Sequence, residues 1–497
     1  MSHLPHHPFF TVLQKAREHG HTAVTMEMAN SLKRSHHLDF SGVERVSRLV
    51  ERGEIVSNGV LYGGARGLTA EARIGLWLAG QRVAGASAAI SLPAPEASLT
   101  ASQRSAWAFL GASLPVSARC LTGLPGTGKT WLICRWIEAL TKRGAYVSIA
   151  APTGKAASVL YEKLERLVPV STVHRLLGWR PGMDPTSFIN ADYLIVDESS
   201  MLDAEMLGHL VTACLPSTQI ILVGDPHQIP PVGPGSPFID LLSVLPVSTL
   251  TEIQRQQSGN GILHLAHAAA DGKLYIPERN VYQQSVPSEL LDEAAQQMYC
   301  SGRYGGVKDV VILSAIRKES YEASVGTINH GISHALHPDR TLGRSKFTKG
   351  DRLMFTVNNY QHGFVNGELG VLQDYHKRQA RIVNDSGKEY IIDDYGLGQH
   401  AEWAYAMTIH KAQGSECRTV ILLLHPRMRF MYSRNLLYTA ITRAREELIV
   451  LGEWGVLRDG LQHEEKRVTL LPWLMEQPEV CRRILDYGTP PDLSGYI

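Results

Sequence analysis

The residues with the most specific chemistry form a glycine-rich loop that begins at Gly123. The loop reads Gly-Leu-Pro-Gly-Thr-Gly-Lys-Thr and satisfies the pattern G-x-x-x-x-G-K-[ST] in full. In such a loop, backbone N–H groups and the positive end of the following helix bind phosphate. Lys129 would reach the β- and γ-phosphates as a catalytic residue, and the Thr130 hydroxyl would bind Mg²⁺. The residues expected to hold ATP here are Gly123, Pro125, Gly126, Thr127, Gly128, Lys129 and Thr130.

Polar residues that could complete this site follow two apolar runs further along the chain. Asp197 and Glu198 come directly after Tyr193–Val196, and Gln228 follows the run 219–223. Because open α/β sheets bind ligands at the carboxyl ends of their strands, we expect these side chains to meet the nucleotide. Asp197 would hold Mg²⁺ and Glu198 would deprotonate the attacking water. Gln228 would sense the γ-phosphate, since an amide both donates and accepts hydrogen bonds.

Two arginines are candidates for coupling ATP hydrolysis to a movement of domains. Arg255 lies in the segment 250–256, and Arg443 lies in the segment 437–445. A charged side chain that reaches across a cleft to the γ-phosphate makes domain closure depend on ATP. Taken singly, each arginine is more simply explained as a surface salt-bridge residue, because exposed arginine is common.

Short apolar runs that alternate with helical segments must position these groups. Runs of this kind predict parallel sheets that are buried on both faces. They fall into two sets, which indicates two α/β domains. The first set lies at 118–122, 147–151, 193–196 and 219–223, and the second lies at 310–313, 419–424 and 447–451.

Two further regions have a different pattern. In residues 11–90, helical stretches near 26–33 and 43–51 precede an Asn58-Gly59 pair between apolar β-formers, which predicts a β-hairpin. Helices followed by a β-ribbon indicate a winged-helix-like unit. Residues 347–400 contain several short β-rich runs with tight turns, which predict a small all-β insertion, in the form of a barrel.

The composition indicates a globular protein with several domains. The chain has 497 residues, and 49 Lys and Arg residues nearly balance 48 Asp and Glu residues, giving a net charge of +1. A nucleic-acid partner would therefore need a local basic groove. Six scattered cysteines without a CxxC pair indicate a reducing compartment and argue against a zinc site. No run resembles a signal peptide or a membrane span, so a cytoplasmic location is expected.

Taken together, the motifs resemble the full series of a superfamily-one helicase, in the 5′→3′ branch that includes RecD-like and Dda-like enzymes. The resemblance implies an ATP-dependent DNA helicase that moves 5′→3′ on single-stranded DNA. The series consists of residues 99–103, the glycine-rich loop, 151–157, 171–177, 197–198, 224–228, Arg255, 405–416 and 437–445.

The resemblance also implies roles that the residues alone leave unassigned. Gln103 would contact adenine, and Glu416 would contact the ribose. Arg255 and Arg443 would be arginine fingers. The residues that match nucleic-acid contacts are Pro152, Thr153, Thr172, His174, Thr408 and His410.

The implied architecture is two RecA-like parallel-sheet motor domains, with a small N-terminal winged-helix-like domain and an SH3-like β insertion in the second motor domain. The implied boundaries are 1–90 for the N-terminal domain, 91–250 for the first motor domain with a short pin near 176–191, 251–345 and 401–497 for the second motor domain with a C-terminal tail, and 346–400 for the insertion.

Several alternatives stay open at this point. The loop in which this branch places its strand-separating pin is short, so translocation is better supported than strand separation. Contacts to a backbone do not distinguish DNA from RNA, which leaves an RNA-directed helicase as an alternative. A third possibility is a motor subunit of a recombination or repair complex, with a protein partner on the N-terminal domain. The first expectation is a monomer that acts on single-stranded DNA and ss/ds junctions in a bacterial or phage setting.

Overall fold

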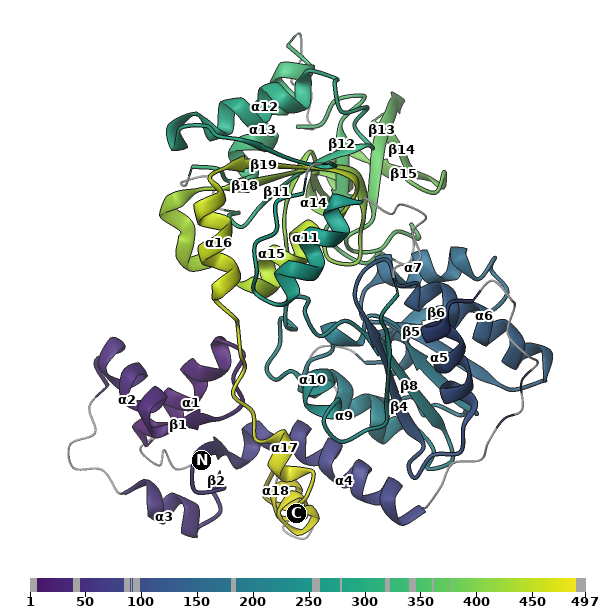
Figure 1. The fold of residues 1–497 in the computed structure, drawn as a ribbon, viewed down its shortest axis with the longest axis vertical. Helices are drawn as coiled ribbons and strands as arrows, with labels where there is room; N and C mark the ends of the chain where they lie inside the picture. Colours follow the sequence, from purple (N-terminus) through teal and green to yellow (C-terminus); the bar gives the residue numbers. More distant parts are fainter. Residues whose placement is uncertain are drawn as a thin grey trace.

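The computed structural model describes residues 7–38, 45–84, 90, 92, 99–179, 185–252, 260–277, 279–317, 322–338, 346–359, 362–376 and 378–488. The fold is mixed α/β with parallel sheets, as predicted from the apolar runs. Figure 1 shows one α/β lobe at the lower right and a second α/β lobe at the top. The N-terminal helices lie at the lower left, beside the C-terminal helices.

The first parallel sheet has six strands in the order β6-β5-β7-β8-β4-β9. Neighbouring residues on its central strands face opposite sides, so Leu194 and Ile195 of β7 enter hydrophobic clusters on opposite faces. The strands are β4 (Ala118–Gly123), β5 (Val147–Ala151), β6 (Val170–Thr172), β7 (Tyr193–Val196), β8 (Gln219–Gly224) and β9 (Val247–Leu250). The helices around it are α5 (Ala101–Gly111), α6 (Lys129–Lys142), α7 (Gly154–Lys163), α8 (Val173–Leu176), α9 (Ala204–Ala213) and α10 (Pro237–Leu241).

The second parallel sheet has five strands in the order β10-β19-β18-β11-β17. Helices cover both of its faces: Ile262 and Leu437 belong to the cluster on one side, and Leu291 and Ile328 to the cluster on the other. The strands are β10 (Val281–Gln284), β11 (Val310–Ser314), β17 (Ala406–Thr408), β18 (Cys417–Leu424) and β19 (Ala444–Gly452). The helices are α11 (Gly261–Ala270), α12 (Leu291–Cys300), α13 (Val325–Leu336), α15 (Arg434–Ile441) and α16 (Trp454–Gln462).

An antiparallel sheet of five strands interrupts the second α/β domain. Its core contains Phe355 stacked on Phe364, with ring centroids 4.1 Å apart. The prediction of an all-β insertion is wrong in one detail, because the Asp393 carboxylate accepts from Gly396 N at 2.8 Å and starts a helix. The elements are β12 (Arg352–Phe355), β13 (Leu369–His376), β14 (Gln379–Asn384), β15 (Glu389–Asp393), α14 (Asp394–His400) and β16 (Ala401–Trp403).

The N-terminal unit combines helices with a small antiparallel sheet of order β1-β3-β2. The predicted hairpin is confirmed: Gly59 has a φ of 93°, and Asn58 Oδ1 accepts from the backbone N–H groups of Val60 and Leu61. The elements are α1 (Pro8–Glu18), β1 (Val24–Thr25), α2 (Met26–Ser35), α3 (Val46–Glu51), β2 (Ile55–Ser57), β3 (Leu61–Gly64), the 3₁₀ turn Ala65–Leu68 and α4 (Thr69–Ala84).

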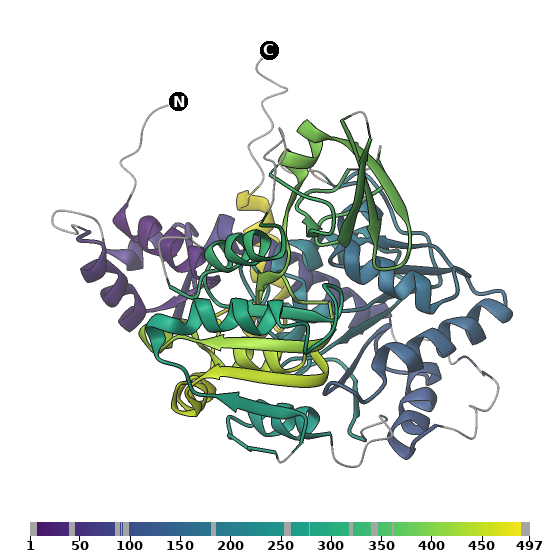
Figure 2. The ribbon, with the colours of Figure 1, turned by 90° about the horizontal axis from the view of Figure 1, so that it is seen from above.

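The end of the chain returns from the second α/β domain to helix α4. Two helices, α17 (Leu471–Leu474) and α18 (Pro478–Gly488), pack beside α4, where Ala72 shares a hydrophobic cluster with Leu474 and Cys481 (Figures 1 and 2). This segment therefore joins the N-terminal unit to the motor rather than extending the second sheet.

Membrane-spanning helices and clusters of metal-binding side chains are both absent from the described residues. No helix there has the length and apolarity needed to span a bilayer. Within the same residues, no group of three or more His, Cys, Asp or Glu side chains is placed to hold a metal ion. The six cysteines are free thiols.

Candidate functional site

The glycine-rich loop lies between the end of β4 and the start of α6. Gly128 takes a φ of 86° immediately before Lys129 begins the helix, a conformation that glycine adopts without steric cost. The Lys129 ammonium donates to the carbonyl oxygens of Gly123 and Leu124, so it lies inside the curve of the loop. Backbone N–H groups, a helix N-terminus and an ammonium thus converge where phosphates are expected.

The two predicted acids follow β7 and face this loop. Thr130 Oγ1 donates to Asp197 Oδ2 at 3.2 Å, so a hydroxyl and a carboxylate lie together, and Mg²⁺ prefers oxygen ligands of this kind. Burial raises the pKa of Asp197, while the Glu198 N–H, the Lys129 charge and the Thr130 hydroxyl oppose that shift. The residues present therefore fit a magnesium ion.

Glu198 occupies a strained backbone position with a φ of 55°. A non-glycine residue in this left-handed region costs about 1 kcal/mol or more, and such strain gathers at functional sites. Burial, and next the neighbouring Asp197 carboxylate, raises the pKa of Glu198 to about 7, while Arg443 and Lys129 oppose the shift. A carboxylate with a pKa near neutrality is suited to accept a proton from water.

The loop that follows β8 carries Gln228 and is held by helix α15 of the second α/β domain. The Tyr438 hydroxyl donates to Asp225 Oδ2 at 2.6 Å, and Ile229 N donates to Thr439 Oγ1 at 3.0 Å. Asn435 Nδ2 donates to the carbonyls of His227 and Gln228, both at 3.2 Å. These bonds join the two α/β domains directly at the nucleotide side.

Gln228 itself keeps one unused acceptor. Its Oε1 is buried and has no hydrogen-bond partner among the described residues. An unpaired buried amide oxygen is costly unless a ligand or water donates to it. This agrees with the prediction that Gln228 contacts the γ-phosphate or the attacking water.

The remaining predicted nucleotide residues have different placements. Gln103 completes the capping box of α5 with Thr100 and donates from Nε2 to Thr127 O at 3.1 Å, so it touches the glycine-rich loop. Arg443 is buried and donates to Thr439 O, Ser415 O and Thr442 Oγ1, all in its own domain. Glu416 is exposed in the loop between β17 and β18. Arg255 lies outside the described residues.

A groove of about 300 Å³ lies where the first α/β domain, the second α/β domain and the insertion meet. Its lining includes most of the predicted nucleic-acid residues, namely Pro152, Thr153, Thr172, His174 and His410. The lining does not include Thr408, whose hydroxyl accepts from Lys411 N at 3.3 Å. The structure thus gathers residues from two α/β domains into one channel, and their role in strand binding stays a prediction.

Two threonines that line this groove can donate hydrogen bonds from their hydroxyl groups. Thr153 Oγ1 accepts from Ala156 N and caps α7, and Thr172 Oγ1 accepts from Arg175 N and caps α8. Because each oxygen already accepts a backbone bond, its proton can donate to a phosphate oxygen. Such contacts position a strand without reading its sequence.

A column of rings supports the groove wall at His174. His174 stacks on Trp179 with centroids 4.9 Å apart, and Trp179 lies against His209 at 5.0 Å. Arg73 Nη1 of helix α4 lies 3.2 Å from His209 Nδ1, so the column reaches the helix that follows the N-terminal unit. Burial lowers the pKa of His174, which favours the neutral ring. The pin predicted near 176–191 includes residues 180–184, which lie outside the described part of the chain.

Sequence reasoning missed the residues of α15 that join the domains. Asn435, Tyr438 and Thr439 lie within or beside the quoted motif 437–445, but only its arginine received a role. A usable signal existed, because three polar side chains interrupt an otherwise apolar helix whose residues Asn435–Ile441 are all buried. Buried polar groups require partners, so these positions had to face another element.

Comparison with known proteins adds to this geometry. Residues 98–284 match a family described as an AAA domain, and residues 403–451 match the UvrD-like helicase C-terminal domain. The chain is 32% identical over 364 residues to an ATP-dependent RecD2 DNA helicase of Deinococcus radiodurans, covering 71% of this chain and 49% of that relative. It is 29% identical over 400 residues to a RecBCD enzyme subunit RecD of Mycolicibacterium smegmatis, covering 70% of this chain and 71% of the relative.

Solved structures give more distant similarities. A Pif1 helicase from Bacteroides in complex with ADP-AlF3 and ssDNA aligns with a TM-score of 0.48 at 19% identity, over 73% of this chain and 94% of that one. The chain spans about half the length of the RecD2 relative.

Proposed function

We propose that this chain is a RecD-like superfamily-one helicase, an ATP-driven motor that moves 5′→3′ on single-stranded DNA and opens duplex DNA. The observation that carries the proposal is the bonding of α15 to the loop 225–229. That loop belongs to the domain with the glycine-rich loop, whereas α15 belongs to the domain that presents His410 to the groove. A change at the nucleotide therefore has a direct path to one wall of the groove.

In the hydrolysis step, the chain's own residues bind, orient and accept a proton. Lys129 would hold the β- and γ-phosphates, and Gln228 would orient the attacking water through its unused acceptor. Glu198 would take the proton from that water, since its pKa lies near neutrality. Mg²⁺, held by Thr130 and Asp197, would supply charge neutralisation of the phosphates.

Movement would follow from domain closure. The positive charge of Arg443 opposes the rise in the pKa of Glu198, and domain closure would bring this guanidinium to a γ-phosphate. Arg255 would act in the same way. Closure would shift His410 relative to Thr153 and Thr172, because the groove takes its walls from both α/β domains. The direction of movement is proposed from the branch that the motif series resembles.

The proposal also covers the N-terminal unit and the antiparallel insertion. The N-terminal helices with their β1-β3-β2 sheet support a winged-helix-like unit, and the five-stranded antiparallel insertion supports an SH3-like subdomain. We propose that the motor acts as a monomer on ss/ds junctions, with the N-terminal unit available to a protein partner.

A second candidate is a motor within a larger recombination or repair complex. The Mycolicibacterium smegmatis relative is named as a subunit of the RecBCD enzyme, and this chain covers 71% of it. Size-exclusion chromatography of the purified chain, alone and after incubation with extract of the source cells, would distinguish a lone monomer from a stable subunit.

Strand release from tailed duplexes tests the proposed function. A 5′-tailed DNA duplex, a 3′-tailed DNA duplex and a 5′-tailed RNA duplex would be incubated with ATP, scoring phosphate and released strand in the same tubes. Release from the 5′-tailed DNA alone is expected. ATP turnover without stimulation by any of these strands would contradict the proposal.

A further inference from the structure

The loop that carries Gln228 has no regular structure of its own to hold its shape. Residues 225–236 form neither helix nor strand, and positions 226, 230, 231 and 234 are prolines, which have no backbone N–H to donate. Backbone carbonyls that are shielded from water need donors, so this loop depends on groups from other segments. Helix α15 supplies one such group, Asn435, to the carbonyls of His227 and Gln228. The second half of the loop needs a different partner.

Arg467 donates to the carbonyls in this second half of the loop. Its Nη2 bonds Pro231 O and its Nη1 bonds Gly233 O, both at 2.5 Å, and Nη1 also donates to Gly20 O at 3.4 Å. Every hydrogen bond that Arg467 makes within the described residues thus goes to a main-chain carbonyl. Because a guanidinium is a planar fork, two carbonyls bonded to it are fixed in orientation as well as in position.

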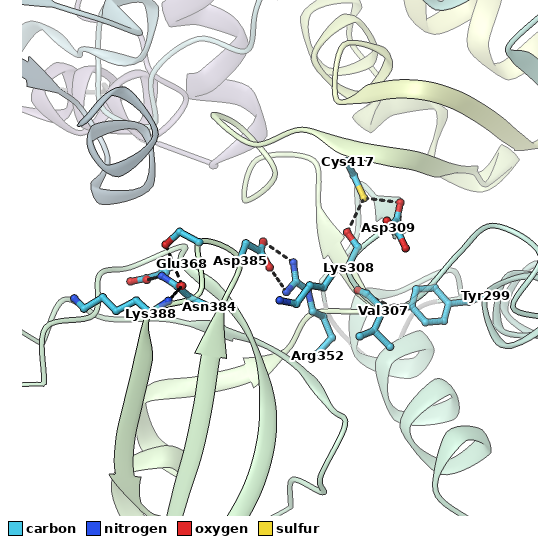
Figure 3. Close-up of polar contacts among 11 residues, drawn as sticks. Tyr299, Val307, Lys308, Asp309, Arg352, Glu368, Asn384, Asp385, Lys388 and Cys417 are labelled. Carbon is cyan, nitrogen blue, oxygen red and sulfur yellow. Dashed lines mark hydrogen bonds and ion pairs between the residues drawn. The ribbon is translucent and has the colours of Figure 1, made fainter. Parts of the chain in front are cut away.

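Arg352 of the insertion shows a different way of satisfying a buried arginine. Its guanidinium donates to both carboxylate oxygens of Asp385, at 2.5 and 2.7 Å, as Figure 3 shows. Arg467 instead keeps its charge against neutral carbonyls. Burial lowers the pKa of Arg467, while Glu465 and Asp203 oppose that shift. A half-buried cation without a bonded carboxylate is costly, so we expect the geometry that it holds to be used.

Arg467 lies in the segment 463–470, which we call the strap. The strap joins α16 to α17 and runs from the second α/β domain to the first, as Figure 1 shows. Near its start it is bonded to α15, where Asn435 Oδ1 accepts from Glu465 N at 3.4 Å. The same Asn435 side chain bonds the first half of the loop that carries Gln228. Helix α15 and the strap therefore hold the two halves of this loop together.

The far end of the strap is fixed by contacts that do not involve the loop. Thr469 Oγ1 donates to Asp240 Oδ2 of α10 at 3.0 Å. Gly20 of the N-terminal unit lies against Arg467, where an added Cβ atom would be 2.1 Å from Nη1, so this unit leaves only the space that the guanidinium fills. These contacts fix Arg467 independently of the loop.

The stretch between the contact of Arg467 and Gln228 is short and stiff. Ile229 N is bonded to Thr439 Oγ1, and the prolines at 230 and 231 have φ angles fixed by their rings. A displacement of Pro231 would therefore reach Gln228 instead of being absorbed by backbone rotation. Gln228 Oε1 is buried and unpartnered within the described residues, and a misplacement of about 1 Å can cost a reaction up to about 100-fold in rate.

We propose that Arg467 is a positioning residue for Gln228. By holding the second half of the loop, Arg467 keeps the Gln228 amide directed at the attacking water and the γ-phosphate. The proposal rests on the proposed function, because that function gives Gln228 its role. The strap would thereby contribute to ATP hydrolysis, although it lies beyond the last motif of the series, which ends at residue 445.

A double-mutant cycle with Gln228 tests this assignment. Strand-stimulated ATP turnover would be measured for the wild type, Arg467→Met, Gln228→Ala and the double variant. Methionine keeps an unbranched apolar stem but has no N–H groups to donate. Arg467→Met should lower kcat about tenfold and change KM for ATP less than about twofold. In the Gln228→Ala background the same substitution should lower kcat less than about twofold, because the side chain that it positions is absent.

Two further variants separate positioning from stability. Thr469→Val breaks the bond between the same strap and Asp240 and should leave kcat unchanged. Arg467→Lys keeps a charged donor without the fork and should recover part of the lost kcat. Thermal melting of each variant controls for folding. If Arg467→Met does not fold, Arg467→Lys takes its place in the cycle, with the same loss of effect expected beside Gln228→Ala.

The outcomes distinguish this proposal from the proposed function. An equal fall in kcat with and without the Gln228 amide would overturn the positioning role and leave the proposed function intact. A fall in Thr469→Val as large as that in Arg467→Met would do the same, since the strap as a whole would then be responsible. If the wild type shows no strand-stimulated turnover, the proposed function fails, and the role of Arg467 fails with it.

Discussion

The nucleotide site around the glycine-rich loop and the groove both lie at the junction between the two α/β domains, but their charged groups are satisfied in different ways. In the nucleotide site, Thr130 donates to Asp197, and Arg443 donates to oxygens of its own domain. In the groove, Lys411 is paired with Glu402, whereas Lys155 has no partner among the described residues. Polar groups that bond one another hold the geometry of a site when no ligand is bound. An unpaired charge instead gains the most interaction energy when a ligand of opposite charge binds. The charged groups of the nucleotide site are therefore organised in advance, whereas Lys155 in the groove gains most from a bound strand.

The largest effect on activity is expected from a substitution in the nucleotide site. Lys129→Ala should lower ATP turnover at least about 100-fold, because no other group of the loop supplies a positive charge to the transferred phosphate. Lys142→Ala, at the other end of the same helix, is the matched control and should turn over ATP normally. Phosphate release measures both, and substantial turnover by Lys129→Ala would show that the loop is not the hydrolysis site.

A smaller effect is expected at the bond between the domains. Tyr438→Phe removes the donor to Oδ2 of the buried Asp225 carboxylate, which should reduce strand-stimulated ATP turnover about tenfold. Tyr432→Phe is the control, since this buried tyrosine bonds only within the second domain among the described residues, to His425 N and Leu423 O. Equal losses in the two variants would mean that the Tyr438 bond serves stability and not coupling.

The ring column gives a third prediction, on the groove side. Trp179→Ala removes the ring that holds His174, and an aromatic pair contributes about 0.5–1.5 kcal/mol. Affinity for oligo-dT should fall about threefold to tenfold, and Trp179→Phe should restore most of it. Anisotropy measures the affinity, and unchanged binding by Trp179→Ala would remove His174 from the strand site.

The smallest effect concerns nucleotide selection. Gln103→Glu keeps the oxygen that caps Thr100 N but loses the amide donor that bonds Thr127 O. Preference for ATP over GTP should fall about fivefold, as expected for one lost hydrogen bond near the base. Competition kinetics would measure the ratio, and an unchanged ratio would exclude Gln103 from the base site.

The sequence predicted those parts of the fold in which apolar runs end in polar residues. Strands β7 and β8 are buried along their whole length, and both were expected within one residue of their bounds. The edge strand β9 was not expected, because only its last residue is buried and its residues form no apolar run. The nucleotide site was predictable because the glycine-rich loop binds phosphate through its own backbone, so a local sequence pattern is enough to identify it.

The groove and the contacts between the two α/β domains are formed by segments that lie far apart in the sequence. Tyr438 and Asp225 are 213 residues apart, and no local pattern shows that they meet. Lys155 stood in a quoted motif, but its surroundings become visible only when the insertion is in place, with Val365 packed on the neighbouring Gly154 and Asp385 near the lysine charge. The return of α18 to α4 was not expected either, since its apolar residues could have packed on any neighbouring face.

Directional displacement of streptavidin from biotinylated oligo-dT is the most direct measurement of movement along a strand. Biotin at the 3′ end and biotin at the 5′ end would be compared in the presence of ATP, with Lys129→Ala as the inactive control. A motor that moves 5′→3′ should strip streptavidin from the 3′ end and leave the 5′ end bound. If the protein hydrolyses ATP in the presence of the strand but displaces streptavidin from neither end, ATP hydrolysis at the nucleotide site is not coupled to movement of the strand in the groove.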